Sequence, residues 1–361
     1  MDKKQPLVSV VIPAYNAEKY IGEAIESILN QTFKDFELII YDDGCKDNTV
    51  TVIRSYEDDR ITLLRGDINR GVMYGLNQGL EIAKGKYIAM LDSDDVAHPA
   101  RLQKEVEYLE AHDNVVLVGT RIEKRKDGVI CEQPVSPVRT GNQIRFELLF
   151  ENGSIAHSSF MVRREILEQH HLRYEIFHYV QDYHMLTRIS RCGDLACLEE
   201  TLVTYRVHEQ QATNYRSRRM RTDEFDLARC LYIDSLPLSE EHKIILKKLI
   251  CRDLNGKNDY RMLHEAYEAY RDMCLLKKEN EEDQQCCRYI LRGELIQQKH
   301  NWALLGYYLR SEYKDKKWLC SPAGLKFVIK CIINYNKCWY ASMVDYRNVE
   351  QSVLKICDYD H

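Results

Sequence analysis

The residues best suited to chemistry in this sequence are three closely spaced aspartates at the end of an apolar run. Residues 86–91 (Lys-Tyr-Ile-Ala-Met-Leu) lead directly into Asp92-Ser-Asp-Asp95. A strand that ends in clustered carboxylates places them at the carboxyl edge of a sheet, where open α/β folds bind their ligands. Carboxylate oxygens at this spacing suit Mn²⁺ or Mg²⁺, often together with a diphosphate. The alternative is a solvated acidic turn before the next helix, since such turns are common.

The segments before this acidic run alternate strand and helix patterns, which predicts a mostly parallel sheet. Short apolar runs rich in β-formers occur at 7–12, 36–41, 61–64 and 87–91, and segments with helical spacing lie between them. Polar groups follow three of these strands: Tyr15-Asn16, Asp42-Asp43 and Asp92 to Asp95. This arrangement suits a nucleotide whose base meets a carboxylate while a metal bridges its diphosphate. Neither GxGxxG nor GxxxxGK[ST] occurs, so a dinucleotide or P-loop site is not expected.

Length and composition narrow the class of protein further. At 361 residues the chain is too long to fold around one modest hydrophobic core. We therefore expect two domains, or one large α/β domain with an appendage. The formal net charge of -5 gives no case for nucleic acid binding. The 13 cysteines form no CxxC pair, which indicates reduced thiols and no zinc site. The sequence shows no signal region and no apolar stretch of membrane-spanning length, so we expect a cytoplasmic protein.

The order and spacing of these motifs resemble the inverting glycosyltransferases of family 2, which have the GT-A fold. The resemblance covers about the first 210 residues. Its segments are Val-Ser-Val-Val-Ile-Pro-Ala-Tyr-Asn at 8–16, 29–33, Asp-Asp-Gly-Cys-Lys-Asp-Asn-Thr at 42–49, 69–71, 77, 83–87, 91–95, 157–164, 181–182, 188 and Thr-Tyr-Arg-Val-His at 204–208. The layout most resembles bacterial lipooligosaccharide transferases that add N-acetylhexosamine or galactose from UDP-sugars.

The resemblance implies a UDP-sugar donor site at the strand ends. Asp43 would accept the N3–H of uracil, and Asp92 would face the ribose or the metal. The other implied donor contacts are Pro13, Tyr15, Asn16, Asn69, Arg70, Asn77, Ser93 and His157. Leu76 stands where the family often has an arginine before the asparagine. Two purely structural interpretations stay open: Asp42 as the cap of a tight turn, and His157 as a histidine without a role in binding or catalysis.

The resemblance also implies metal ligands and a general base. Asp94 would bind Mn²⁺ or Mg²⁺, and His208 of the Tyr-Arg-x-His pattern would contact the metal or the diphosphate. Asp182 would be the base, while Gln181 replaces the glutamate of the family's Glu-Asp pair. As alternatives, Asp182 is an acidic residue stabilised by the helix dipole, and Asp95 caps the following loop.

The pattern changes after residue 213. Strand signals stop and apolar positions recur at helical spacing from 223 to about 296. We therefore expect a GT-A catalytic domain at 1–213 and a helical domain at 214–361. A basic tail from Lys314 to Lys337 carries six lysines among aromatic residues. This tail either lies on an anionic membrane surface, which would make the protein peripheral at the inner face of the membrane, or packs with a lysine-rich solvent edge.

The expected function is an inverting, metal-dependent transfer of a hexose or N-acetylhexosamine from a UDP-sugar to a saccharide or lipid-linked saccharide. The product would be a cell-surface glycan such as lipooligosaccharide, capsule or O-antigen. A nucleotidyltransferase is one alternative, but it would show a glycine-rich basic loop where Pro-Ala-Tyr-Asn stands at 13–16. A catalytically silent sugar-nucleotide or glycan-binding module is another, and the joint presence of Asp94, Asp182 and His208 argues against it.

Overall fold

The computed structural model describes residues 5–286, with gaps at 133–139, 151–154, 176, 178, 210, 212–217, 255–256, 277–279, 281 and 284–285. The chain divides into two compact units, Met1–Ala228 and Arg229–His361. The predicted boundary at 213 and the basic tail from Lys314 lie outside the described residues. Among the described helices, none is both long and apolar enough to cross a bilayer.

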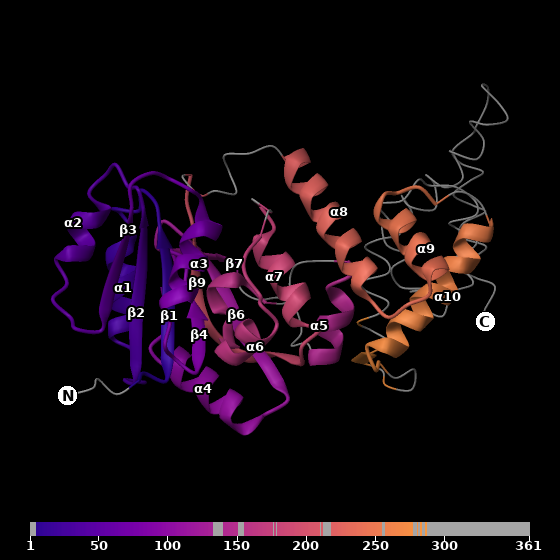
Figure 1. The fold of residues 1–361 in the computed structure, drawn as a ribbon, viewed down its shortest axis with the longest axis horizontal. Helices are drawn as coiled ribbons and strands as arrows, with labels where there is room; N and C mark the ends of the chain where they lie inside the picture. Colours follow the sequence, from indigo (N-terminus) through magenta and orange to yellow (C-terminus); the bar gives the residue numbers. More distant parts are fainter. Residues whose placement is uncertain are drawn as a thin grey trace. The chain divides into compact units, whose positions relative to one another are not determined.

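The first half of the first unit is the predicted alternation of strands and helices. Strands β1 to β4 are all parallel, and Figure 1 shows them side by side. Every residue of β1 is buried, as expected for a strand covered on both faces. The elements are β1 (Val8–Ala14), α1 (Ile21–Leu29), β2 (Phe36–Asp43), α2 (Thr49–Arg54), β3 (Ile61–Gly66), α3 (Val72–Ile82) and β4 (Tyr87–Met90).

The strand order places a ligand-binding position at the ends of β1 and β4. The nine-stranded sheet has the order β3-β2-β1-β4-β8-β6-β9-β5, and β7 pairs with β6 beside this path. The chain forms β1, β2 and β3 outward in one direction and then returns to place β4 on the other side of β1. Crevices outside the carboxyl ends of strands at such a switch point are where open α/β sheets bind ligands. The residues after β1 and the acidic run after β4 therefore meet at one edge.

The second half of the sheet mixes directions. β8 is antiparallel to β4 and β6, whereas β9 runs parallel to β6. The α/β fold class and its mostly parallel central sheet are thus confirmed. The elements are β5 (Val96–Ala97), α4 (Arg101–Ala111), β6 (Val115–Lys126), β7 (Val129–Glu132), α5 (Gly141–Glu147), the 3₁₀ turn η1 (His157–Ser159), β8 (Met161–Arg163), α6 (Arg164–Gln169), α7 (Gln181–Ile189) and β9 (Asp194–Val207).

The predicted helical region after the sheet is also confirmed over the described residues. Its helices are α8 (Arg218–Ser235), α9 (Glu240–Ile250) and α10 (Lys257–Met273). Ser239 caps α9, since its hydroxyl accepts a hydrogen bond from the backbone N–H of His242 at 3.2 Å. Within the second unit, α9 packs against α10, and the buried hydroxyls of Tyr232 and Tyr270 lie 3.5 Å apart.

A fully buried ion pair ties α4 to the end of β4. The guanidinium of Arg101 contacts Glu105 (Nε to Oε1, 3.0 Å), and neither side chain is exposed. Nη2 of Arg101 also donates to the backbone oxygen of Met90 at 2.9 Å and to that of Phe160 at 3.3 Å. This arginine therefore fixes the backbone immediately before the acidic run. Burial raises the pKa of Glu105 to about 7, although Arg101 opposes this shift.

We expect replacement of Glu105 by glutamine to flatten the dependence of stability on pH. Because the pKa rises from 4.5 in the unfolded chain to about 7 in the fold, the folded state binds the proton more tightly. The contribution of Glu105 is full below pH 4.5 and is lost as the pH rises through about 7. Over this pH range the free energy of unfolding of the wild type should fall by about 3 kcal/mol. Glutamine does not titrate, so the Glu105→Gln variant should lack this decrease.

Urea unfolding at pH 4.5 and pH 8 measures this difference. Glu107, which is exposed on the same helix, provides the control as Glu107→Gln, and that variant should keep the wild-type pH dependence. Equal pH dependence in the Glu105→Gln variant and the wild type would contradict the prediction.

Candidate active site

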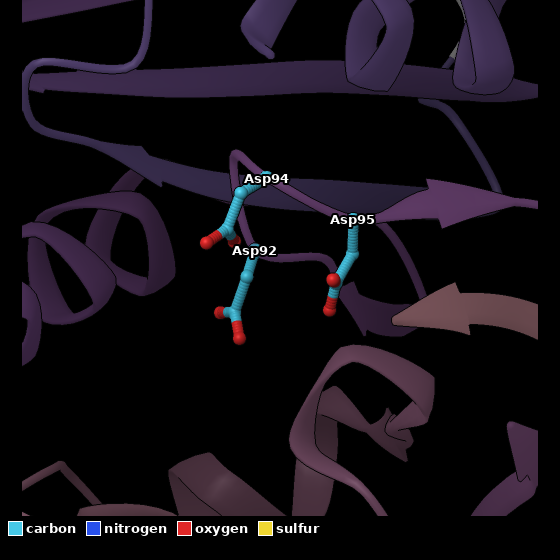
Figure 2. Close-up of side chains that lie close together, drawn as sticks. All are labelled: Asp92, Asp94 and Asp95. Atoms are coloured by element: carbon cyan, nitrogen blue, oxygen red, sulfur yellow. The ribbon is translucent and has the colours of Figure 1, made fainter. Parts of the chain in front are cut away.

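The predicted acidic cluster forms at the carboxyl end of β4. Oxygens of Asp92, Asp94 and Asp95 all lie within 4.8 Å of one another. Figure 2 shows the three side chains extending from one loop toward the same side. Ser93 lies half-buried in this loop. Three carboxylates this close repel one another, so the group is suited to holding a divalent cation.

Asp95 is the innermost member of the cluster. It is fully buried, and it accepts hydrogen bonds from the Ser158 hydroxyl at 2.5 Å and the backbone N–H of Arg206 at 3.1 Å. Burial, together with the charges of Asp94 and Asp92, raises the pKa of Asp95 well above its usual range. Both of its oxygens are thus engaged by donors of the protein, and it anchors the loop as the predicted cap would.

Asp92 is held by the 3₁₀ turn η1. Its carboxylate lies 3.3 Å from Nδ1 of His157, and its backbone N–H donates to the Ser158 hydroxyl at 3.3 Å. Burial raises the pKa of Asp92, but the hydrogen bond and charge of His157 outweigh it and leave the pKa lowered. Burial by itself would lower the pKa of His157, but the hydrogen bond to Asp92 and the negative charge of Asp92 outweigh burial, so the pKa is raised. The side chain of Asp92 keeps 35% of its surface exposed, so it remains accessible to a ligand.

The structure brings the two predicted metal ligands together. Nε2 of His208, just after β9, lies 2.9 Å from Oδ2 of Asp94, although 114 positions separate the two residues. The ring of Tyr20 stacks on the imidazole of His208 at 4.3 Å between centroids. Arg206 donates through Nε to the backbone oxygen of Asp94, and its Nη1 pairs with Glu23 at 2.8 Å. The end of β9 is therefore fastened to the acidic loop.

The two carboxylates at the end of β2 are both engaged by the protein. Asp42 is fully buried and accepts from the backbone N–H of Cys45 at 2.8 Å, in addition to pairing with Arg65 at 3.1 Å. It therefore caps the tight turn, as one of the two interpretations from the sequence had it. Asp43 accepts from the backbone N–H groups of Arg70 and Gly71, each at 2.8 Å. Asp43 thus holds the segment that carries Asn69 and Arg70 beside the strand ends.

The remaining predicted donor contacts lie at the same edge of the sheet. Pro13 is buried in β1, whereas Tyr15 is 47% exposed just beyond it. Asn16 has a positive φ of 49°, and its Oδ1 accepts from the backbone N–H of Lys46 at 2.8 Å. The exposed Arg70 places its guanidinium 4.8 Å from the ring centroid of Tyr74. An exposed tyrosine and arginine beside the ends of β1 and β2 are suited to contacting a base and a phosphate.

Asn77 differs from the predicted nucleotide contact. Its Nδ2 donates to the backbone oxygen of Tyr174, and its Oδ1 accepts from the backbone N–H of the same residue, both at 2.9 Å. Both polar groups of this amide are thus used to hold another segment of the chain. Tyr174 itself is buried, and its hydroxyl lies 2.9 Å from Nε2 of His157. The sequence pattern contains no signal for this contact, because residues 173–180 carry no readable motif.

Asp182 approaches from a different element. It is half-buried in the first turn of α7. Burial raises the pKa of Tyr174 well above its usual range, and the charges of Asp182 and Asp92 add to this effect. The charge of Asp182 also acts on His157. The charges of Asp182 and Asp92 therefore both act on His157 and Tyr174.

The strand order, the switch point and the acidic edge are those expected of a glycosyltransferase of the GT-A fold. Residues 9–170 match the profile of Glycosyl transferase family 2. The chain is 36% identical over 224 residues to an uncharacterized glycosyltransferase of Haemophilus influenzae, covering 58% of this chain and 68% of that one. The chain therefore belongs to glycosyltransferase family 2.

The chain is also similar to a relative whose name states a pathway and to a solved structure. The chain is 40% identical over 111 residues to the putative teichuronic acid biosynthesis glycosyltransferase TuaG of Bacillus subtilis, covering 30% of this chain and 44% of that one. Among solved structures, S. aureus TarS 1-349 in complex with UDP-GlcNAc matches with a TM-score of 0.56 at 18% identity, covering 96% of this chain and 91% of that chain. This last similarity shows that the fold is shared.

Proposed function

We propose that this glycosyltransferase moves a hexose or N-acetylhexosamine from a UDP-sugar to a saccharide hydroxyl, with inversion and with the help of Mn²⁺ or Mg²⁺. The observation that carries the proposal is the group of three carboxylates within 4.8 Å at the switch point of the sheet. A diphosphate cannot approach such a group without a cation between them. The UDP-GlcNAc complex of TarS supports a UDP-sugar as donor, and the teichuronic acid pathway named for TuaG supports a cell-surface glycan as product.

The residues present fit a divalent ion. Asp94 and Asp92 offer partly exposed carboxylates, and His208 adds an imidazole beside Asp94. These are oxygen and nitrogen donors of the kind that Mn²⁺ accepts. The ion, when bound, neutralises the charge that develops on the departing diphosphate. Asp95 supports the loop from the inside, since both of its oxygens are occupied by protein donors.

The other side chains bind the donor and move one proton. Tyr15, Asn16 and Arg70 surround the nucleotide at the ends of β1 and β2, while Asp43 fixes the segment that carries Arg70. Asp182 accepts the proton of the acceptor hydroxyl. The acceptor oxygen then forms its bond to the anomeric carbon as the bond from that carbon to the diphosphate breaks, and UDP leaves.

A panel of UDP-sugars with Mn²⁺ tests the proposal through release of UDP. The productive donor should also stabilise the fold by about 2.7 kcal/mol at a hundredfold excess over its dissociation constant. Stabilisation without any UDP release, even with saccharide acceptors, would instead indicate a silent sugar-nucleotide-binding module. Release of pyrophosphate from UTP and a sugar phosphate would indicate a nucleotidyltransferase.

A further inference from the structure

A continuous chain of hydrogen bonds links the acidic loop to a buried tyrosine. Oδ1 of Asp92 lies 3.3 Å from Nδ1 of His157, and Nε2 of the same imidazole lies 2.9 Å from the hydroxyl of Tyr174. The rings of His157 and Tyr174 meet edge to face, with centroids 5.7 Å apart and an interplanar angle of 80°. His157 and Tyr174 are 9% and 5% exposed, so water has little access to these bonds.

The chemistry of the three groups sets the direction of these bonds. An ionised carboxylate can only accept hydrogen bonds, so Nδ1 of His157 carries the proton that faces Asp92. At a pH above the raised pKa of His157 the imidazole is neutral, so Nε2 is an acceptor and the Tyr174 hydroxyl is the donor to it. Removing this hydroxyl would leave the buried Nε2 without the hydrogen bond that fixes the orientation of the ring.

The backbone of Tyr174 is held unusually firmly for a segment outside helices and strands. The amide of Asn77, on α3, makes two hydrogen bonds to it, as described above. The neighbouring oxygen of Arg173 accepts from Nη1 of Arg188 at 2.8 Å, and Arg188 also pairs with Glu175 at 3.1 Å. Since Arg188 lies on α7, the helix that carries Asp182, this segment connects the helix of the proposed base with the residue that holds Asp92.

We propose that Tyr174 is a positioning residue of the transfer reaction: its hydroxyl holds the His157 ring turned toward Asp92, which keeps the Asp92 carboxylate aimed at the donor. This inference rests on the proposed function for its effect on turnover. Its structural part concerns only the imidazole and can be measured without substrate. Tyr174 acts through His157, so its effect should vanish when His157 is absent.

A double-mutant cycle tests this dependence. Tyr174→Phe keeps the ring and should lower kcat/KM by about 10–100-fold, as is typical when an outer partner of a site residue is removed. In a His157→Ala background the same change should alter kcat/KM by less than about twofold, because the two residues act as one unit. Tyr87→Phe is the matched control. Tyr87 is a fully buried tyrosine at the amino end of β4, and its hydroxyl contacts Glu110 at 2.9 Å. This control should keep wild-type turnover.

The imidazole nitrogens provide a second readout that needs no turnover. Long-range ¹H–¹⁵N spectra, with the His157 signals assigned by their loss in His157→Ala, should show a protonated Nδ1 in the wild type and in Tyr87→Phe. Tyr174→Phe should shift the Nε2 signal, because this acceptor loses its donor, and should change the Nδ1 signal as the hydrogen bond to Asp92 weakens. Unchanged nitrogen shifts, or an equal loss of kcat/KM in both backgrounds, would overturn the role of Tyr174. A wild type that turns over no UDP-sugar would overturn the proposed function alone, since the nitrogen shifts would still decide the role of Tyr174.

Discussion

Replacing Asp94 by alanine is expected to remove the metal-dependent part of UDP binding while the fold survives. The carboxylate of Asp94 is only half-buried, and its one side-chain partner at the cluster is His208, 2.9 Å away. Without the Asp94 carboxylate, the remaining groups bind a cation weakly. Less positive charge then offsets the repulsion between Asp92 and the diphosphate. Loss of a direct metal ligand should cost at least the roughly 10–100-fold in metal affinity that is typical when an outer partner of a ligand is removed.

Calorimetric titration of UDP in Mn²⁺ and in EDTA measures this effect. The wild type should bind UDP much more tightly in Mn²⁺, and Asp94→Ala should bind it about equally weakly in both. Asp113→Ala is the control, because Asp113 is an exposed aspartate that precedes β6 at the opposite edge of the sheet. If the wild type binds UDP with the same affinity in EDTA as in Mn²⁺, the acidic cluster has another purpose.

The first four strands could be predicted from the sequence because each is a short apolar run bounded by polar residues. β1 and β4 are buried along their whole length, and such runs have few alternatives to a covered parallel strand. The acidic run directly follows the carboxyl end of β4, so its position at the carboxyl edge of the sheet could also be predicted. The pairing of His208 with Asp94 could be anticipated only through the family pattern, since the two residues are 114 positions apart and neither carries a local signal of the contact.

Other parts of the site depend on loops whose path the sequence does not encode in a readable pattern. Asp42 had two interpretations, and the turn to Cys45 decides for the cap because the backbone N–H lies 2.8 Å from its carboxylate. The resemblance implies a nucleotide contact for Asn77, yet its amide pairs with the backbone of Tyr174, 97 positions further along the chain. A side chain that can serve either a ligand or a backbone is assigned only when the opposing segment is placed.

Replacing Asp182 by asparagine should lower kcat by about 10²–10⁴-fold, the usual contribution of a positioned general base. In an inverting displacement the acceptor hydroxyl attacks the anomeric carbon opposite to the departing UDP. One base must therefore lie on the acceptor side, while the proposed function uses Asp92 and Asp94 on the diphosphate side. Asp182 belongs to α7 and acts on His157 and Tyr174 from a separate element. Asparagine keeps the shape of the side chain but cannot take up the proton.

The affinity for UDP and for Mn²⁺ should stay nearly unchanged in Asp182→Asn, because neither ligand requires a proton acceptor at this position. Glu165→Gln is the matched control: it removes an exposed carboxylate from the first turn of α6, which follows β8 at the opposite edge of the sheet. Each change removes a favourable helix-dipole interaction of about 0.3–1 kcal/mol, so only the loss of kcat should distinguish them. Loss of UDP binding in Asp182→Asn would make Asp182 a donor-site or structural residue. Undiminished turnover would remove it from the mechanism.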